Sequence, residues 1–308
     1  MSVAFLFPGQ GSQQPDMLHE LPDHPVITQT LEEASTILDK DIFTFDTDSA
    51  LSSTTAVQIA LFVAGVSTAR ALKAEGAMPD MVAGHSVGAF AAAVVAGALD
   101  FRDALSLVKL RGELMENAFP QGYGMAAVIG LDERRLASLI GQVGEPVFIA
   151  NLNAPDQITI AGSIPGIEAA LAMASAAGAH RAEILRVSVP SHCPLLQHVS
   201  YQLARALDEV HFREPVVPYG GNRRARALRD PEAIREDLAM SVAHPVRWHE
   251  VTTLFFELGA RLFLEMPPGH VLTDLVAAAF PAARSISVTK SGLDSAVIIT
   301  RREKGRTR

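Results

Sequence analysis

The chain has 308 residues, of which 48% are hydrophobic, and its formal net charge is −8 at pH 7. That length and apolar content allow one large core, or one core with an inserted subdomain. The acidic balance, without a basic patch before the last few residues, argues against a nucleic-acid partner. The single cysteine, Cys193, excludes an internal disulfide and disfavours a thiolate metal site, so no metal is expected.

The N-terminal residues lack a signal-peptide pattern, because Met1 leads directly into a short strand-like run. The longest apolar stretches, near residues 57–66 and 87–99, are shorter than the ~20 residues that cross a bilayer. From both observations we predict a cytoplasmic protein without a membrane partner.

The first elements in chain order are a buried strand over residues 3–7 and a Gly-rich loop, Pro8 to Gln13. The glycine spacing in this loop fits neither a P-loop nor a dinucleotide fingerprint. Two interpretations stay open: a plain turn, or a loop that presents backbone N–H groups to a developing oxyanion. Helices are predicted over residues 25–38 and 56–75, the second after capping Ser and Thr residues and before Gly76.

A G-x-S-x-G motif, Gly84 to Gly88, follows an apolar strand at 81–84 and precedes a small-residue helix at 89–99. This order is typical of a nucleophile elbow, in which the turn exposes Ser86 and aims a helix N-terminus at it. Glycine on each side gives the sharp turn room. A strand–turn–helix without any chemistry is the alternative.

The next helix, residues 102–118, contains Arg111, whose guanidinium is either solvated or functional. A strand–helix–strand–strand–helix–strand order then follows, with strands at 125–129, 147–151, 157–161 and 182–187 and helices at 133–140 and 166–177. This order predicts a ferredoxin-like subdomain. We place it at residues 122–189, inserted into a core of residues 1–121 and 190–308.

His192 comes directly after the insertion, in the run Pro190-Ser191-His192. The order serine, then histidine, is compatible with an elbow serine and a later base, although a structural histidine is the alternative. Other candidates are His85, His198, His244, His249 and His270. We expect the ring of His85 to point away from the Ser86 hydroxyl, and periodicity does not choose among the rest.

After the His192 segment, a helix is predicted that ends at about residue 210. Further helices are predicted at 231–242, 248–259 and 271–279, and strands at 215–219, 262–266 and 285–289. The tail, residues 301–308, is rich in Lys and Arg without an apolar pattern and is predicted to be frayed.

Taken together, the motifs resemble the malonyl-CoA:acyl-carrier-protein transacylase family over nearly the whole chain. The segments that carry the resemblance are 7–13 (FPGQGSQ), 84–88 (GHSVG), 110–112 (LRG), 150–155 (ANLNAP), 190–193 (PSHC) and 265–269 (EMPPG). More narrowly, segments 17–25, 84–90 and 122–128 look like the epsilon subunit of malonate decarboxylase. The fatty-acid enzymes usually carry Leu-Gly-Glu-Tyr where this chain has residues 87–90, VGAF.

The resemblance implies an α/β-hydrolase-like parallel-sheet core with a ferredoxin-like (βαββαβ) insertion. It implies Ser86 as nucleophile and His192 as its base. The backbone N–H groups of Gln10 and Val87 would bind the oxyanion. Arg111 would grip the free carboxylate of a malonyl group.

Three further residues are candidates for lining the site. The resemblance places the carbonyl that orients His192 near Ser241, and it suggests Asn153 for the roof of the site. His244 stands where the fatty-acid enzymes tend to have an asparagine, and they tend to have a glutamine near Ser241.

The implied reaction moves malonyl from malonyl-CoA, through a malonyl-serine, to the pantetheine-type thiol of an acyl carrier protein, without a bound cofactor. The narrower resemblance makes that thiol the dephospho-CoA-derived prosthetic group on the malonate decarboxylase carrier subunit. Alternatives are the housekeeping transacylase of fatty-acid synthesis, a serine thioesterase, and a non-catalytic subunit that docks a carrier.

Overall fold

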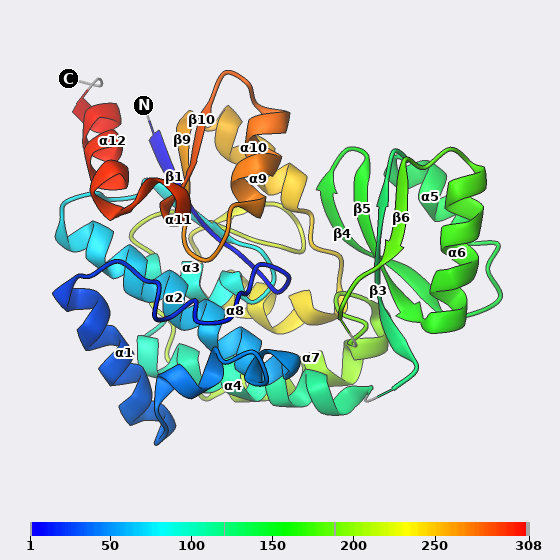
Figure 1. Cartoon of the computed structure of the whole chain (residues 1–308), viewed down its shortest axis with the longest axis horizontal. Helices are drawn as coiled ribbons and strands as arrows, with labels where there is room; N and C mark the ends of the chain where they lie inside the picture. Colours follow the sequence, from blue (N-terminus) through cyan, green and yellow to red (C-terminus); the bar gives the residue numbers. More distant parts are fainter. Residues whose placement is uncertain (1, 120, 188, 306–308) are drawn as a thin grey trace.

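The computed structural model describes residues 2–119, 121–187 and 189–305 and has two lobes (Figure 1). The larger lobe holds a 6-stranded sheet with the strand order β10-β9-β1-β2-β7-β8. Its strands are β1 Ser2–Phe7, β2 Met81–Gly84, β7 Tyr219–Gly220, β8 Ala227–Leu228, β9 Ala260–Glu265 and β10 Arg284–Ser287. All neighbours pair in parallel except β7 and β8. This parallel core fits the α/β prediction.

Helices cover both faces of this sheet, so its central strands are mostly apolar and almost entirely buried. One face packs against a group that includes α2 Thr54–Ala74, α3 Gly88–Val95 and α4 Phe101–Ala118. The other face packs against α9 Trp248–Glu257 and α10 Val271–Ala279. The larger lobe also contains α1 Pro25–Leu38, α7 Gln197–Asp208, α8 Pro231–Met240, α11 Val288–Ser291 and α12 Leu293–Gly305, with short 3-10 turns at 42–45, 50–52, 194–196 and 241–243.

Helix α2 has the length and hydropathy of a membrane span. The apolar stretch at residues 57–66, by contrast, was predicted to be too short to cross a bilayer. Within the most apolar window of α2, however, 89% of the residues are buried inside the protein. The apolar composition of α2 therefore reflects its place at the centre of the core, and the cytoplasmic location stays a prediction.

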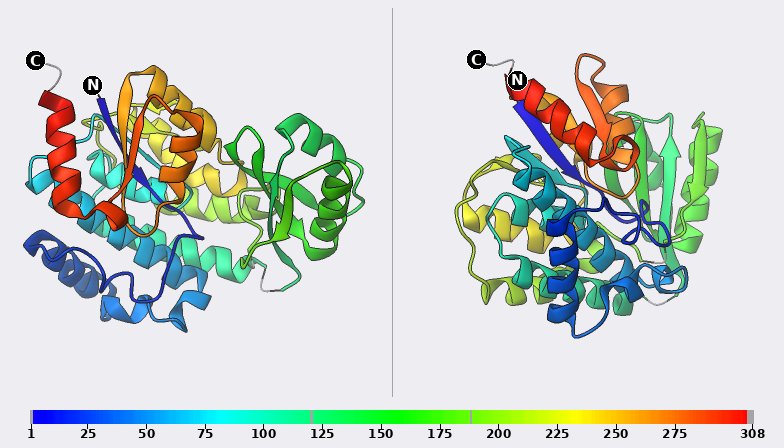
Figure 2. Two further views of the ribbon diagram at one scale, coloured as in Figure 1. Left: turned by 45° about the horizontal axis from the view of Figure 1, so that its top comes forward. Right: turned by 60° about the vertical axis from the view of Figure 1, so that its left-hand side comes forward.

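The smaller lobe, green in Figure 2, contains an antiparallel sheet. This sheet is 4-stranded, with the order β4-β5-β3-β6. Its elements are β3 Tyr123–Ile129, α5 Glu133–Ile140, β4 Val147–Ala154, β5 Gln157–Ser163, α6 Ile164–Ala176 and β6 Arg181–Ile184. The connectivity and strand order are those of the ferredoxin-like motif. The lobe has an apolar cluster of its own, and we propose residues 122–189 as an inserted subdomain.

Backbone hydrogen bonds join the two lobes beside the sheet edge. The amide of Val246 donates to the carbonyl of Ala150 at 2.9 Å, and the amide of Leu152 donates to the carbonyl of Val246 at 2.8 Å. Strand β4 thereby gains a short parallel bridge from the larger lobe. This pairing fixes one wall of the cleft that the candidate site occupies.

Several element boundaries differ from the sequence-based prediction. The strand predicted at 215–219 is only the two-residue β7, because it pairs with β2 through just Tyr219 and Gly220, and β8 was missed. The strand predicted at 285–289 ends at Ser287, where α11 begins. The tail is not frayed up to residue 305: it continues α12, with Arg301 on the carbonyl of Glu75 and Lys304 on Asp80. Residues 306–308 lie outside the described part.

Gly112 generates a prediction about the crossing of α2 and α4. A Cβ at this position would lie 2.6 Å from the Cα of Thr55, so the two helix backbones would have to separate. We expect Gly112→Ala to lower the free energy of unfolding by about 1–3 kcal/mol, measured by urea denaturation. Gly144→Ala, where a Cβ would meet nothing within 4 Å, is the control, and equal losses in both variants would contradict this account.

Candidate active site

Ser86 sits at the apex of the turn between β2 and α3, with a left-handed backbone φ of 56°. A Cβ on Gly84 would lie 1.9 Å from the carbonyl carbon of Gly88, and a Cβ on Gly88 would lie 2.3 Å from the carbonyl oxygen of Phe7. Only glycine fits at either position. The motif glycines thus permit the sharp turn, and the turn holds the serine at the N-terminal end of α3 in a sparsely populated conformation.

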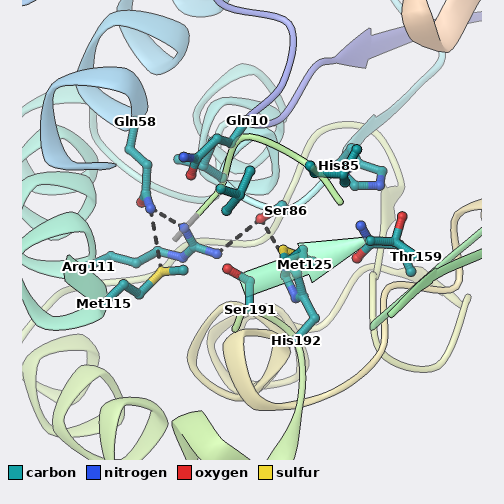
Figure 3. Close-up of a pocket in the computed structure, with 14 residues that line it drawn as sticks. Gln10, Gln58, His85, Ser86, Arg111, Met115, Met125, Thr159, Ser191 and His192 are labelled. Atoms are coloured by element: carbon teal, nitrogen blue, oxygen red, sulfur yellow. Dashed lines mark hydrogen bonds between the residues drawn. The ribbon is translucent and has the colours of Figure 1, made fainter. Parts of the chain in front are cut away.

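The imidazole of His192 lies against the Ser86 hydroxyl, with 2.7 Å between Nε2 and Oγ (Figure 3). On its other side, Nδ1 is 2.7 Å from the backbone carbonyl oxygen of Ser241. A carbonyl only accepts, so Nδ1 carries the proton and the bare Nε2 faces the serine hydroxyl. The backbone of His192 is anchored too, because its amide donates to the carbonyl of Val242 at 2.8 Å.

Burial lowers the pKa of His192 to about 3, and the positive charge of Arg111 acts in the same direction. The hydrogen bond to the Ser241 carbonyl opposes both effects. The imidazole is therefore neutral at physiological pH, which is the state that can take a proton from a hydroxyl.

Arg111 is 1% exposed and reaches the cavity from α4. One terminal nitrogen donates to Ser86 Oγ at 3.1 Å and the other to Gln58 Oε1 at 2.6 Å (Figure 3). Burial lowers the pKa of its guanidinium to about 10, so it stays charged at neutral pH. Across the described residues, no carboxylate forms an ion pair with it. A buried cation without a counter-charge is costly, and this one fits an anionic ligand.

Gln58 was missed by the sequence-based analysis. It is 1% exposed on α2, and its amide nitrogen is 3.4 Å from the sulfur of Met115. The available signal was the single amide side chain in a helix whose buried positions are mostly apolar. A buried amide requires a polar partner, and Gln58 finds it in Arg111.

Gln10 and Val87 both line the same cavity. In the part of the chain that the structure describes, no acceptor is bonded to either backbone N–H. Val87 precedes the first residue of α3, so its N–H belongs to the free donors at a helix N-terminus. Two unoccupied donors beside a serine hydroxyl match what an oxyanion requires.

The other residues predicted to line the site, Asn153, Ser241 and His244, are not in the cavity wall. Ser241 contributes its carbonyl, as described above. His85 turns away from the Ser86 hydroxyl, toward the smaller lobe, where its Nε2 is 3.0 Å from Asn153 Oδ1. Burial lowers the pKa of His85 to about 4. His244 is not in the cavity wall, since its ring contacts the carbonyl of Met240 at 2.8 Å.

The remaining histidines lie outside the cavity. His198 packs near Phe119, His249 stacks on Phe280, and His270 pairs with Asp274. Among the described residues, no group of three or more His, Cys, Asp or Glu side chains is placed to hold a metal ion. The cavity wall consists of Gln10, Gln58, His85, Ser86, Val87, Arg111, Met115, Met125, Asn151, Thr159, Leu185, Val187, Ser191 and His192.

A family comparison agrees with this arrangement. Residues 4–307 match the family described as acyl transferase domain. The chain belongs to that family. It is an acyltransferase.

Individual relatives of this chain are named as transacylases that use malonyl-CoA or malonyl groups. The malonyl CoA-acyl carrier protein transacylase of Salmonella typhimurium is 40% identical over 283 residues, covering 88% of this chain and 91% of the relative. The solved structure of a malonyl CoA-acyl carrier protein transacylase from Coxiella burnetii superposes with a TM-score of 0.93 at 35% identity, covering 98% of both chains. A malonyl-transacylase solved in complex with its type II polyketide acyl-carrier protein gives a TM-score of 0.92 at 36% identity, covering 98% of this chain and 100% of that one.

The low pKa of His192 generates a prediction about pH. An ordinary histidine loses its basic form as the pH falls through about 6.5, whereas His192, with a pKa of about 3, keeps it. We expect a fluorophosphonate probe to label Ser86 at a nearly constant rate from about pH 8 to about pH 5. The native fold is checked by circular dichroism at each pH. Arg111→Gln removes a positive charge beside His192, so the pH below which the labelling rate falls should be higher than in the wild type. A wild-type labelling rate that halves near pH 6.5 would contradict the prediction.

Proposed function

We propose that the protein transfers malonyl from malonyl-CoA to the pantetheine-type thiol of an acyl carrier protein, through a malonyl ester on Ser86. One observation carries the proposal: the buried guanidinium of Arg111, which has no carboxylate partner among the described residues, lies 3.1 Å from the hydroxyl of Ser86. A substrate that brings an acyl carbon to Ser86 can bring a carboxylate to Arg111 at the same time. Malonyl has those two groups.

In the first half-reaction Ser86 Oγ attacks the thioester carbonyl carbon while His192 Nε2 accepts the hydroxyl proton. The carbonyl oxygen becomes an oxyanion, which accepts hydrogen bonds from the backbone N–H groups of Gln10 and Val87. Collapse of the tetrahedral intermediate breaks the carbon–sulfur bond. His192 then returns its proton to the leaving CoA sulfur, which leaves malonyl-serine and a free thiol.

The second half-reaction runs the same steps in reverse with a different thiol. His192 takes the proton from the carrier's thiol, the sulfur attacks the ester carbonyl, and Ser86 leaves with the proton. Each proton and electron pair is accounted for by the serine, the histidine and the two thiols. The chemistry therefore requires no resident cofactor.

Arg111 selects the acyl group. In the free enzyme its terminal nitrogens are bonded to Ser86 and Gln58. A malonyl carboxylate replaces the serine as acceptor and supplies the missing counter-charge, with two parallel hydrogen bonds available to it. Acetyl lacks a carboxylate and would leave the buried cation unpaired, so it is discriminated against.

The acceptor we favour is the acyl carrier protein of fatty-acid synthesis. The names of the transacylase relatives specify an acyl carrier protein as the acceptor. The malonate decarboxylase carrier subunit is the second candidate, supported by the resemblance of segments 17–25, 84–90 and 122–128 to the epsilon subunit. Ala89 and Phe90, two of the three departures from the fatty-acid pattern at residues 87–90, are each 1% exposed and pack in the core. They cannot contact a carrier directly, which weakens their use as markers of the acceptor.

Mass spectrometry after mixing with malonyl-CoA tests the acyl-enzyme. We expect a malonyl adduct on Ser86 that is absent in Ser86→Ala. Arg111→Ala should reduce kcat/KM for malonyl-CoA about 10²-fold or more, because it removes the partner of a buried carboxylate, and should abolish the preference over acetyl-CoA. Lys109→Ala, a half-exposed position on the same helix, is the control and should change neither value. Equal labelling by acetyl-CoA and malonyl-CoA in the wild type would refute the role of Arg111.

A carrier competition tests the acceptor. The purified enzyme receives malonyl-CoA with either the fatty-acid carrier or the malonate decarboxylase carrier subunit, each with its prosthetic group attached. We expect kcat/KM to be at least about tenfold higher for the fatty-acid carrier, a difference of about 1.4 kcal/mol. A preference for the decarboxylase carrier would transfer the proposal to the second candidate. Release of free malonate faster than transfer to either thiol would identify a thioesterase.

A further inference from the structure

The side chain of Asn222 bridges the two ends of the serine turn. Its Oδ1 accepts a hydrogen bond from the amide of Ser86 at 3.0 Å, and its Nδ2 donates to the carbonyl of Gly84 at 2.9 Å. Asn222 is 1% exposed and does not line the cavity around the Ser86 hydroxyl. One amide thus bonds to the backbone on both sides of His85, where the chain enters its left-handed conformation.

Asn222 is itself fixed through its backbone. Its amide donates to Asp237 Oδ2 at 3.0 Å, and its carbonyl accepts from the amide of Arg247 at 2.9 Å. Asp237 is 5% exposed and also accepts from the hydroxyl of Tyr219 and from the amide of Arg223, both at 3.0 Å. A buried carboxylate with these donors holds the segment after β7 in one position.

Helix α8 connects this carboxylate to the histidine side of the site. Asp237 lies in the last turn of α8, and the amide of Ser241 donates to the carbonyl of Asp237. The carbonyl of Ser241 is the group that accepts from His192 Nδ1 at 2.7 Å. One helical turn therefore holds Ser86, through Asn222, and holds His192, through a carbonyl.

We propose that Asn222 and Asp237 are positioning residues that set the Ser86 hydroxyl in register with His192. The proposal rests on the proposed function, in which Ser86 is the nucleophile. The left-handed φ of Ser86 is unfavourable for a residue with a side chain and persists only where its surroundings hold it. Without the amide of Asn222 the turn loses two hydrogen bonds that oppose its relaxation. A displacement of the hydroxyl by about 1 Å is enough to slow the reaction about 10²-fold.

The experiment is a rapid-quench measurement of malonyl-serine formation at saturating malonyl-CoA in the full-length protein. The burst amplitude reports the fraction of folded, active enzyme, whereas the burst rate constant reports the chemistry in that fraction. We expect Asn222→Ala to lower the rate constant by about 10²-fold, with KM for malonyl-CoA changed less than about twofold. Asp237→Asn should lower the rate constant in the same direction.

Asn222→Asp keeps the shape of the side chain, so it serves if the alanine variant fails to fold. Its carboxylate can accept from the Ser86 amide but cannot donate to the carbonyl of Gly84, so the rate constant should again fall. Asp230→Ala is the matched control, because Asp230 caps the other end of α8 through the amide of Ala233. That control should lower the melting temperature while leaving the rate constant unchanged.

Two results would overturn the proposal: a wild-type rate constant in Asn222→Ala or Asn222→Asp, or a change confined to the burst amplitude, as expected of a purely structural residue. Both differ from failure of the proposed function itself. In that case wild-type protein would form no malonyl adduct on Ser86, and no burst would exist to be slowed.

Discussion

The left-handed backbone at Ser86 is the constraint around which the site is assembled. It forces glycine at Gly84 and Gly88, because any side chain there would overlap the turn or the end of β1. It also brings the serine hydroxyl to the N-terminal end of α3, beside the free N–H of Val87. The parallel sheet brings the other site residues close to the serine, because β1, β2 and β7 end at the same edge. The loops that follow these strands carry Gln10, Ser86 and Asn222.

The elbow could be predicted from sequence because its determinants are local. An apolar strand, two glycines and a small-residue helix lie within about twenty positions, and each has a direct steric reason. The split strand order of the smaller lobe was readable for the same reason, since its hairpin and helices alternate along the chain. The ends of the short strands could not be predicted in this way. The length of β7 depends on how far it can pair with β2, and that depends on residues distant in sequence.

The residues that surround Ser86 in the site were harder to predict than the elbow. His192 and Arg111 were candidates from the residues alone, but their roles were assigned only through the resemblance, because nothing in their own neighbourhoods distinguishes them from structural or solvated residues. Gln58 and Asn222 were missed altogether. Asn222 bonds to Ser86 across 136 positions, and Gln58 bonds to Arg111 across 53. Such contacts exist only after α2, α4 and the strands have packed, so a single sequence does not show which partner either amide side chain will find.

In the proposed mechanism, the charge of Arg111 links substrate recognition to the strength of His192 as a base. In the free enzyme this cation is one of the causes that keep the pKa of His192 low. In the proposed mechanism, a bound malonyl carboxylate would offset the positive charge at short range, remove part of that effect and raise the basicity of Nε2. Acetyl cannot do so, and it would meet both an unpaired cation and a weaker base. In the proposed mechanism, the same buried guanidinium therefore discriminates twice, once in binding the carboxylate and once in the proton transfer that would make Ser86 a nucleophile.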